Sequence, residues 1–188
     1  TIKSISRDEW EACRSSKAGG DPFLAYDFFF LLENSNSVGP KTGWIPFYII
    51  FKEKNIVVGI IVSFLKNHSQ GEYVFDHSWA DAYERSGGNY YPKLQVAVPF
   101  TPVSGERILV QSEYEDKVGE MISSAKRLVE ENNLSSLHIT FCSKSFVSVA
   151  KKNNLLVREG IQYHWFNRDY KSFDDFLGSL TYRKRKNI

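Results

Sequence analysis

Side chains that can exchange protons are concentrated in one stretch of this chain, residues 66–93. Attack of an amine on an ester or thioester needs a proton acceptor beside the amine and hydrogen-bond donors facing the developing oxyanion. Asp76, His77 and Glu84 are the candidate bases, and Tyr90 and Tyr91 are the candidate acids or donors. Because polar and aromatic residues together suit a pocket, the stretch predicts a site for acyl transfer. Its other polar side chains include His68, Glu72, Asp81, Arg85 and Lys93.

The same stretch also has a structural interpretation, which we favour for any single residue in it. Alternating tyrosine, phenylalanine and tryptophan are more often core residues than ligand contacts. Charged neighbours are more often solvated or paired than catalytic. Catalysis and structure therefore stay open as alternatives at each position.

Further residues are assigned to substrate and phosphate binding. Arg107 lies beside Ser104-Gly105, and a basic run lies close to residue 188. Arginine side chains at both places could bind phosphate, because a guanidinium group forms two parallel hydrogen bonds to phosphate oxygens. A basic run near a helix C-terminus is also favoured by the helix dipole and by solvation alone. The candidate substrate-binding residues are Trp79, Lys93, Thr101, Arg107 and His164. The candidate phosphate-binding residues are Arg183, Lys184, Arg185 and Lys186.

The cysteines and histidines do not have the spacing of a metal site, so we predict none. Cys13 and Cys142 are far apart in the sequence, which predicts buried, inert thiols and a reducing compartment. His138 and His164 lie in strand patterns without a third ligand placed by spacing. A hydrogen-bonded structural role is the favoured interpretation of both histidines.

The composition is that of an ordinary globular protein, with 42% hydrophobic and 24% charged residues. The net charge of +2 is too small to indicate nucleic-acid binding from bulk charge. The longest apolar run, residues 56–65, is half of the ~20 residues that a membrane-spanning helix needs. The first residues lack the apolar core of a signal peptide. We therefore expect a cytoplasmic protein without a membrane span.

Helix starts are predicted by the capping-box pairs Ser6/Glu9 and Ser112/Glu115 and by Asp21-Pro22. Ser172 is expected to open a final helix. Strands are expected in IPFYIIF, IVVGIIVSFL, residues 73–79, LQVAVPF, RILV, SLHITF and, as a pair or one bent strand, LLVREGIQYHWFN. This order predicts an α/β (mixed α+β) fold with a central mixed, largely antiparallel sheet flanked by helices. We expect one domain over residues 1–188.

Several short sequence segments resemble those of a known protein family. YYPKL, VPFTPV and RKRKNI lie in a chain that, from Asp21 onward, resembles the N-terminal half of FemAB-like proteins of peptidoglycan biosynthesis or recognition. The resemblance implies a GNAT-like acyl-CoA N-acyltransferase fold. It also implies that the final helix and basic tail, residues 172–188, lead to a second GNAT-like half in full-length relatives. The implied activity moves an acyl or aminoacyl group from a CoA thioester or aminoacyl-tRNA to an amine acceptor such as a cell-wall precursor.

The sequence departs from the GNAT pattern at the phosphate loop. A GNAT domain that uses acyl-CoA holds the pyrophosphate on a Gln/Arg-x-x-Gly-x-Gly/Ala loop that opens into a helix. Here PFTPVSGERILV has one glycine and a further strand-like run. The departure favours the alternative function, a non-catalytic recognition or scaffolding half-domain that binds a peptide, sugar or partner domain. The partners that these hypotheses name are a small-molecule or precursor substrate, tRNA, and a second GNAT-like half or another copy of the chain.

Overall fold

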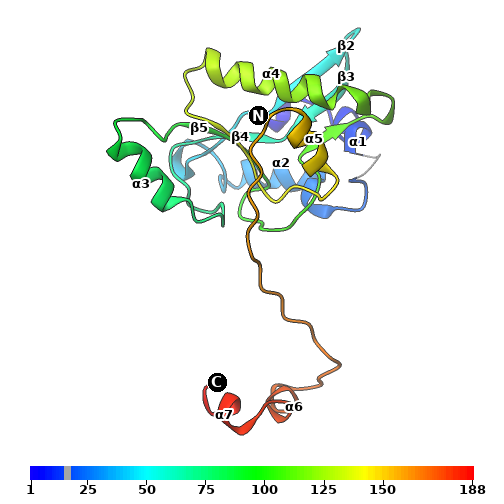
Figure 1. The fold of residues 1–188 in the computed structure, drawn as a ribbon. Coiled ribbons are helices and arrows are strands. Elements are labelled where there is room, and N and C mark those ends of the chain that lie inside the picture. The colour runs from blue at the N-terminus through cyan, green and yellow to red at the C-terminus, as the bar shows by residue number, and fades with distance from the viewer. Residues whose placement is uncertain (15–17) are drawn as a thin grey trace. The chain divides into compact units, whose positions relative to one another are not determined.

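Two small sheets form the centre of the first unit, Thr1–Val157, of the computed structural model, which describes residues 1–14 and 18–188 (Figure 1). The first sheet has the order β1-β4-β5-β7, with strands β1 (Trp44–Pro46), β4 (Ser63–Lys66), β5 (Lys93–Val96) and β7 (Leu137–Ile139). The second has the order β2-β3-β6, with strands β2 (Ile49–Glu53), β3 (Ile56–Ile61) and β6 (Ile108–Val110). All pairs are antiparallel except β5 with β7, which is parallel.

Val62 joins the two sheets, because the chain passes from β3 into β4 through this residue. Its N–H donates to Arg107 O at 3.5 Å, beside β6, and its carbonyl accepts from Ala97 N at 3.3 Å, beside β5. The run IVVGIIVSFL, predicted as one strand, is therefore two strands that belong to different sheets. The predicted fold class, a mixed α/β fold with largely antiparallel sheets flanked by helices, is confirmed.

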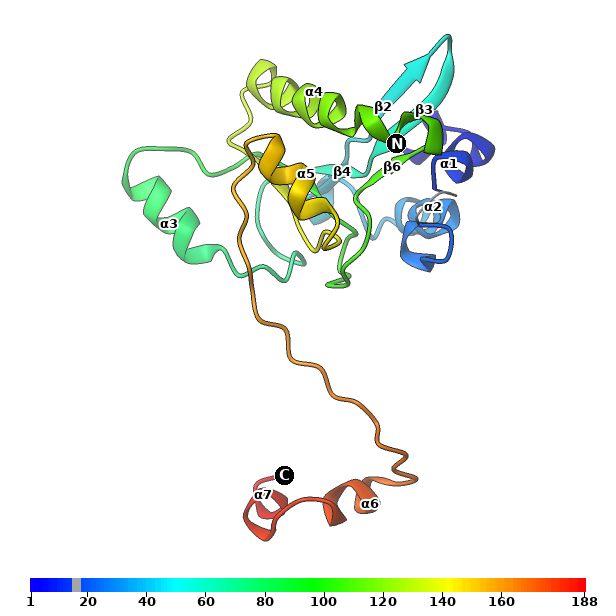
Figure 2. The same ribbon diagram turned by 45° about the vertical axis from the view of Figure 1, so that its right-hand side comes forward.

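Helices cover both faces of the strands (Figure 2). α1 (Arg7–Arg14) and α2 (Tyr26–Asn34) pack against one core cluster, which contains Ile60 and Leu109. α4 (Val118–Glu131) and α5 (Phe146–Lys152) pack against the other, which contains the strand neighbours Ile61 and Ile108. Adjacent strand residues thus point to opposite faces, as the two-residue period of a strand requires. The remaining helical turns of this unit are η1 (Ile2–Ser4), η2 (Pro22–Leu24), η3 (Pro40–Thr42) and η4 (Ser112–Lys117).

The helix starts follow the capping signals. Glu9 Oε2 accepts from the Ser6 backbone N–H at 2.9 Å, and Ser6 Oγ accepts from Glu9 N at 3.3 Å, so this capping box forms. Asp21 Oδ1 accepts from Phe23 N at 2.9 Å and caps η2, which leads into α2. The helix predicted from Ser112 begins there as the 3-10 turn η4 and continues as α4, but its N-cap is Gln111, which makes no side-chain capping bond.

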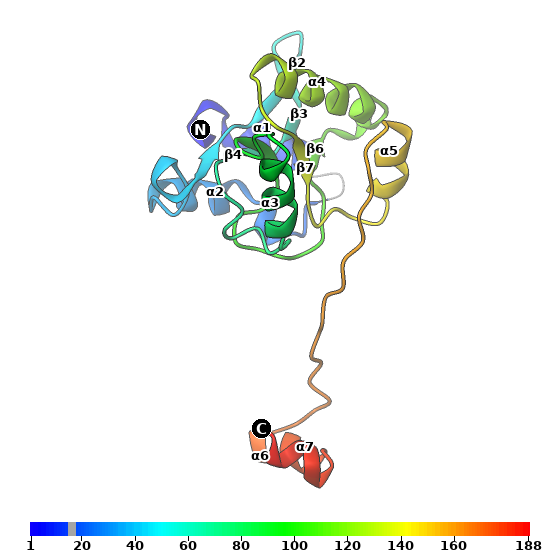
Figure 3. The ribbon, with the colours of Figure 1, turned by 60° about the vertical axis from the view of Figure 1, so that its left-hand side comes forward.

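Two strand predictions are wrong. Residues 73–76 have irregular backbone, and α3 (His77–Arg85) follows where the alternating pattern predicted the end of a strand (Figure 3). Tyr73 and Phe75 have left-handed φ angles of 57° and 55°, which are outside the strand region. Residues 155–167, predicted as a strand pair or a bent strand, have no strand partner among the described residues.

The second unit, Arg158–Ile188, contains two short helices, α6 (Phe173–Gly178) and α7 (Tyr182–Lys186). Ser172 Oγ accepts from Asp175 N at 3.1 Å, which confirms the predicted start of the final helical region. Trp165, Tyr170 and Phe176 pack together within this unit. Among the helices that the structure describes, none combines the length and the apolar character that crossing a bilayer demands.

Candidate functional site

Lys93, the first residue of β5, is the centre of a buried group of polar side chains. Its Nζ donates to Asp76 Oδ2 at 2.7 Å, to Glu72 Oε2 at 2.9 Å and to Ser69 Oγ at 3.0 Å. Lys93 is 0% exposed, and its two carboxylate partners are also buried. One ammonium group thus uses its three donors on three residues of a single preceding segment.

Two tyrosines complete this group. Tyr90 OH donates to Asp76 Oδ2 at 2.7 Å, and Tyr91 OH shares a 2.7 Å hydrogen bond with Ser69 Oγ. Lys93 Nζ lies 5.2 Å from the ring centroid of Tyr90 and 5.6 Å from that of Tyr91. Such distances allow cation–π attraction to both rings. We call the six residues Ser69, Glu72, Asp76, Tyr90, Tyr91 and Lys93 the Lys93 cluster.

The segment that carries the acidic partners, residues 67–76, connects β4 to α3, and we call it the strap. Its polar residues Ser69, Glu72 and Asp76 are buried, whereas Tyr73 and Phe75 are 49% and 76% exposed. Both aromatic residues have the left-handed φ angles given above, a conformation that costs bulky side chains about 1–3 kcal/mol each. The hydrogen bonds to Lys93 therefore hold the strap in a strained backbone conformation.

A second buried lysine lies beside the cluster. Lys66 is paired with Trp44 across β1 and β4, and with Lys93 across β4 and β5, so the three side chains form a row on one face of the sheet. Lys66 Nζ lies 3.9 Å from the ring centroid of Trp44 and donates to Gln70 O of the strap at 3.2 Å. Trp44 Nε1 also donates to Gln70 O, at 3.1 Å. Two lysines and two carboxylates are therefore buried together.

Burial and charge move the pKa values of these groups in different directions. Burial raises the pKa of Glu72 more than the hydrogen bond from Lys93 lowers it. Burial also acts to raise the pKa of Asp76, but hydrogen bonds from Lys93, Ser69 and Tyr90 outweigh it and lower the pKa to about 2. Burial lowers the pKa of Lys66 to about 8. The pKa values of the two carboxyl groups are thus shifted in opposite directions, although both groups bind the same lysine.

Unpaired acceptors surround the cluster. Glu72 Oε1, Asp76 Oδ1 and Gln95 Oε1 are buried side-chain oxygens without a hydrogen-bond partner, among the described residues. His138 of β7, whose register partner is Gln95, lies with its ring centroid 5.9 Å from that of Tyr90. Burial lowers the pKa of His138 to about 4, and the nearby Lys93 charge adds to that effect. All three unpaired atoms are hydrogen-bond acceptors.

The predicted site residues separate into groups. The structure brings together Asp76, Tyr90, Tyr91 and Lys93 in the Lys93 cluster. His77, Trp79 and Glu84 lie exposed on α3. Thr101 is half-buried, and its Oγ1 donates to Pro99 O at 3.0 Å. The residues that lie in the second unit, all exposed, are His164, Arg183, Lys184, Arg185 and Lys186.

Arg107 is buried, and its guanidinium group donates to main-chain carbonyls. Nε donates to Thr140 O at 2.8 Å, Nη1 to Glu106 O at 2.8 Å and Nη2 to Val103 O at 2.5 Å. These bonds join the loop before β6 to the end of β7. Burial lowers the pKa of Arg107 to about 10, although Asp21 opposes that shift.

Sequence reasoning missed Ser69, Glu72 and Lys66 as site residues. Glu72 lies in the polar stretch that was singled out, but no role was assigned to it. The available signal was the presence of two lysines at strand ends, at the C-terminal end of β4 and the N-terminal end of β5. Only the antiparallel register of these strands makes Lys66 and Lys93 neighbours.

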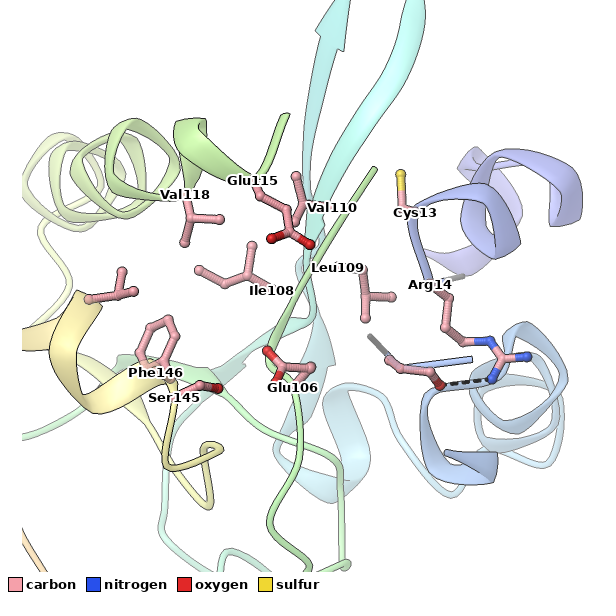
Figure 4. Close-up of a pocket in the computed structure, with 12 residues that line it drawn as sticks. Cys13, Arg14, Glu106, Ile108, Leu109, Val110, Glu115, Val118, Ser145 and Phe146 are labelled. Atoms are coloured by element: carbon pink, nitrogen blue, oxygen red, sulfur yellow. Dashed lines mark hydrogen bonds between the residues drawn. The ribbon is translucent and has the colours of Figure 1, made fainter. Parts of the chain in front are cut away.

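A cavity of about 100 Å³ lies elsewhere, beside β6 and between α1 and the α4–α5 pair (Figure 4). Ile108 and Phe146 provide apolar walls, and the Glu106 and Glu115 side chains point toward it. Burial raises the pKa of the lining Cys13 thiol to about 11, so the thiolate form is disfavoured at neutral pH. This is consistent with the prediction of an inert thiol. Of the Cys, His, Asp and Glu side chains that the structure describes, no three come together as a metal site.

The lowered pKa of Asp76 predicts a loss of stability in acid. A carboxyl group whose folded pKa lies below its unfolded value of 3.8 stabilises the fold above that value, and the contribution disappears as pH falls toward 2. We expect wild type to lose about 2 kcal/mol more of its unfolding free energy than Asp76→Asn between roughly pH 5 and pH 2. Urea unfolding at both pH values measures the difference. Equal acid losses in the two proteins would show that Asp76 does not make this contribution.

Comparison with known proteins gives one match. The FemAB-like family model, described as peptidoglycan biosynthesis/recognition, matches residues 1–188. Comparisons with curated proteins and with solved structures give no match.

Proposed function

The chain belongs to the FemAB-like family over residues 1–188, and from this membership we propose that it is an N-acyltransferase or aminoacyltransferase that uses the Lys93 cluster. The donor is a CoA thioester or an aminoacyl-tRNA, and the acceptor is an amine, such as that of a cell-wall precursor. A single GNAT-like domain and a cytoplasmic location are parts of the same proposal.

The observation that carries the proposal is that two carboxyl groups bound to one lysine have pKa values shifted in opposite directions. Pairs of titratable groups whose environments drive their pKa values apart are typical of acid–base sites. Glu72 has a raised pKa and an unpaired Oε1, which suit a proton acceptor. Asp76 has a pKa of about 2 and remains ionised, which suits it to hold Lys93 and Tyr90 in place.

In the proposed reaction the amine nitrogen bonds to the carbonyl carbon of the donor, and the carbon–sulfur or carbon–oxygen bond to the carrier breaks. The proton that the amine releases passes to Glu72 and then to the departing thiolate or alkoxide. Tyr91, whose hydroxyl group shares a hydrogen bond with Ser69, supplies a donor toward the oxyanion that forms on the carbonyl oxygen. Tyr90 and Lys93 donate to the strap and act by holding its carboxylates in position. His77 and Glu84 on α3 stay predicted catalytic residues. The residues that stay predicted substrate contacts are Trp79, Thr101, Arg107 and His164. Arg183–Lys186 stay a predicted phosphate contact.

A second candidate function is a recognition module that binds a peptide, sugar or partner domain without catalysis. The observation that favours it is the complete burial of Lys93, whose three hydrogen bonds all go to the strap. A cluster of this kind also fixes a loop conformation. The two candidates differ in whether an acyl donor binds and reacts.

Donor binding and transfer distinguish the candidates. Specific binding of acetyl-CoA or charged tRNA raises the unfolding temperature by mass action, so each is titrated into the protein first. With the donor that binds, Glu72→Gln is expected to lower the rate of transfer to an amine by about 100-fold or more, as loss of a general base does. Glu130→Gln, at an exposed position on α4, is the matched control and leaves the rate unchanged. No stabilisation by any donor would reject the transferase in favour of the recognition module.

A further inference from the structure

The row formed by Trp44, Lys66 and Lys93 presents two cations on one face of the first sheet. Side chains directly opposite each other on antiparallel strands have Cβ atoms about 5 Å apart, so the two lysines are close enough for one anion to contact both. Like charges at this separation repel each other, and they need a counter-charge when they are buried. Among the described residues, the counter-charge comes from Glu72 and Asp76 of the strap.

The strap carboxylates satisfy the lysines incompletely. One oxygen of each carboxylate accepts a hydrogen bond from Lys93 Nζ. The other oxygen, Glu72 Oε1 or Asp76 Oδ1, is buried and has no hydrogen-bond partner in the part of the chain that the structure describes. Lys66 Nζ donates a hydrogen bond to a main-chain carbonyl, Gln70 O, and lies over the ring of Trp44. Glu72 and Asp76 therefore neutralise the two lysines without satisfying all of their own hydrogen-bonding atoms, and the charges of Lys66 and Lys93 suit a different anion.

The strap also keeps an unfavourable backbone conformation while it is closed. Gly71, Tyr73 and Phe75 alternate along it, and all three have positive φ angles. A Cβ atom on Gly71 would lie 2.7 Å from the Phe100 ring, so the strap passes close to that ring. Tyr73 and Phe75 are 49% and 76% exposed, so the packing of their rings compensates for the strain only in part. The ion pairs with Lys93 therefore oppose a backbone that favours opening.

We propose that Lys66 and Lys93 form a binding site for an oxyanion, and that the strap covers this site with Glu72 and Asp76 in the place of the oxyanion. When the strap opens, a phosphate group accepts hydrogen bonds from both ammonium groups and replaces the two carboxylates. Other ionisable groups close to the two lysines are Tyr90 and Tyr91 before β5, His138 on β7 and His68 of the strap. The tyrosine hydroxyl groups supply further donors.

This inference rests on the strap and the lysines, and it does not depend on the proposed transferase activity. If that activity holds as well, phosphate competes with the closed strap that places Glu72 on Lys93. Binding of inorganic phosphate is measured without acyl donor or acceptor. The two proposals can therefore fail separately.

The experiment is a calorimetric titration of the full chain with inorganic phosphate, and with acetate, at constant ionic strength. Tyr73→Gly/Phe75→Gly removes the left-handed strain and stabilises the closed strap, so the phosphate Kd is expected to rise roughly tenfold. Tyr73→Ala/Phe75→Ala is the matched control, because it removes the same rings and keeps the strain. Its phosphate Kd is expected to stay close to that of wild type.

Two further comparisons complete the test. Lys66→Met preserves the length of the side chain and removes one cation, and phosphate binding is expected to weaken by about tenfold or more. Acetate, with one charge, is expected to bind more weakly than phosphate. The proposal is overturned if wild type does not bind phosphate. It is also overturned if wild type, the glycine variant and Lys66→Met all bind phosphate with the same Kd. Should Lys66→Met fail to fold, equal Kd values for the glycine and alanine variants overturn it alone.

Discussion

Lys93→Met is expected to lower the unfolding free energy by about 3–5 kcal/mol at neutral pH. The substitution keeps the apolar part of the side chain and removes the ammonium group that binds Glu72 and Asp76. Two carboxylates then remain buried beside each other with Lys66 as their only buried cation in the row. Leaving a buried charge without its partner costs more than the net worth of the ion pair, which is why a single substitution has so large an effect.

The measurement is urea unfolding of wild type and Lys93→Met, with Lys152→Met as the control. Lys152 is exposed on α5, and its loss is expected to change the unfolding free energy by at most about 0.5 kcal/mol. A Lys93→Met protein as stable as the control would mean that the strap is not fastened by this lysine. The proposals for the Lys93 cluster would then lose their geometric basis.

Arg107→Lys is expected to cost about 2–4 kcal/mol of unfolding free energy, although it preserves the charge. The guanidinium group contacts the carbonyls of Val103, Glu106 and Thr140 at once, in a planar arrangement that one ammonium group cannot reproduce. The substitution leaves carbonyl groups in a buried region without donors. It is therefore expected to loosen the connection between the loop before β6 and the end of β7.

The matched control is Arg127→Lys, at an exposed position on α4, with an expected change of at most about 0.5 kcal/mol. Thermal and urea unfolding measure both variants. If Arg107→Lys is as stable as Arg127→Lys, the guanidinium contacts do not stabilise the loop.

The parts of the fold that were predictable from the sequence are those that depend on local signals. The capping box of Ser6 and Glu9 and the Asp21-Pro22 start act over two or three residues, and the helices begin where they indicate. The buried strand run 56–65 was visible as hydrophobic sequence. Its division at Val62 was not, because the division depends on bonds to Arg107 and Ala97, which lie far along the chain.

The strap shows why alternation failed as a strand signal. Tyr73 and Phe75 alternate with Val74 and Asp76 in the sequence, as strand residues do. In the structure Asp76 turns inward to reach Lys93, and the preceding residues adopt left-handed angles to allow it. The bond to a residue 17 positions away outweighs the local preference.

The sequence indicated which region of the chain holds the candidate site, but not how its side chains are arranged. Asp76, Tyr90 and Lys93 were singled out by residue type, and they do lie together. The catalytic assignment of His77 and Glu84 beside them stays a prediction, since both lie on α3 with exposed side chains. Lys66 was not singled out, because its place beside Lys93 comes from the pairing of β4 with β5.

The most direct test of this account is a double-mutant cycle between Lys93 and Asp76, measured by urea unfolding at neutral pH. The four proteins are wild type, Lys93→Met, Asp76→Asn and the double variant, and Lys93→Met with Asp81→Asn serves as the reference cycle. A closed strap fastened by this ion pair predicts a coupling free energy of about 2 kcal/mol for Lys93 with Asp76. It predicts none for Lys93 with Asp81, which is exposed on α3. Additive effects of Lys93→Met and Asp76→Asn would contradict it.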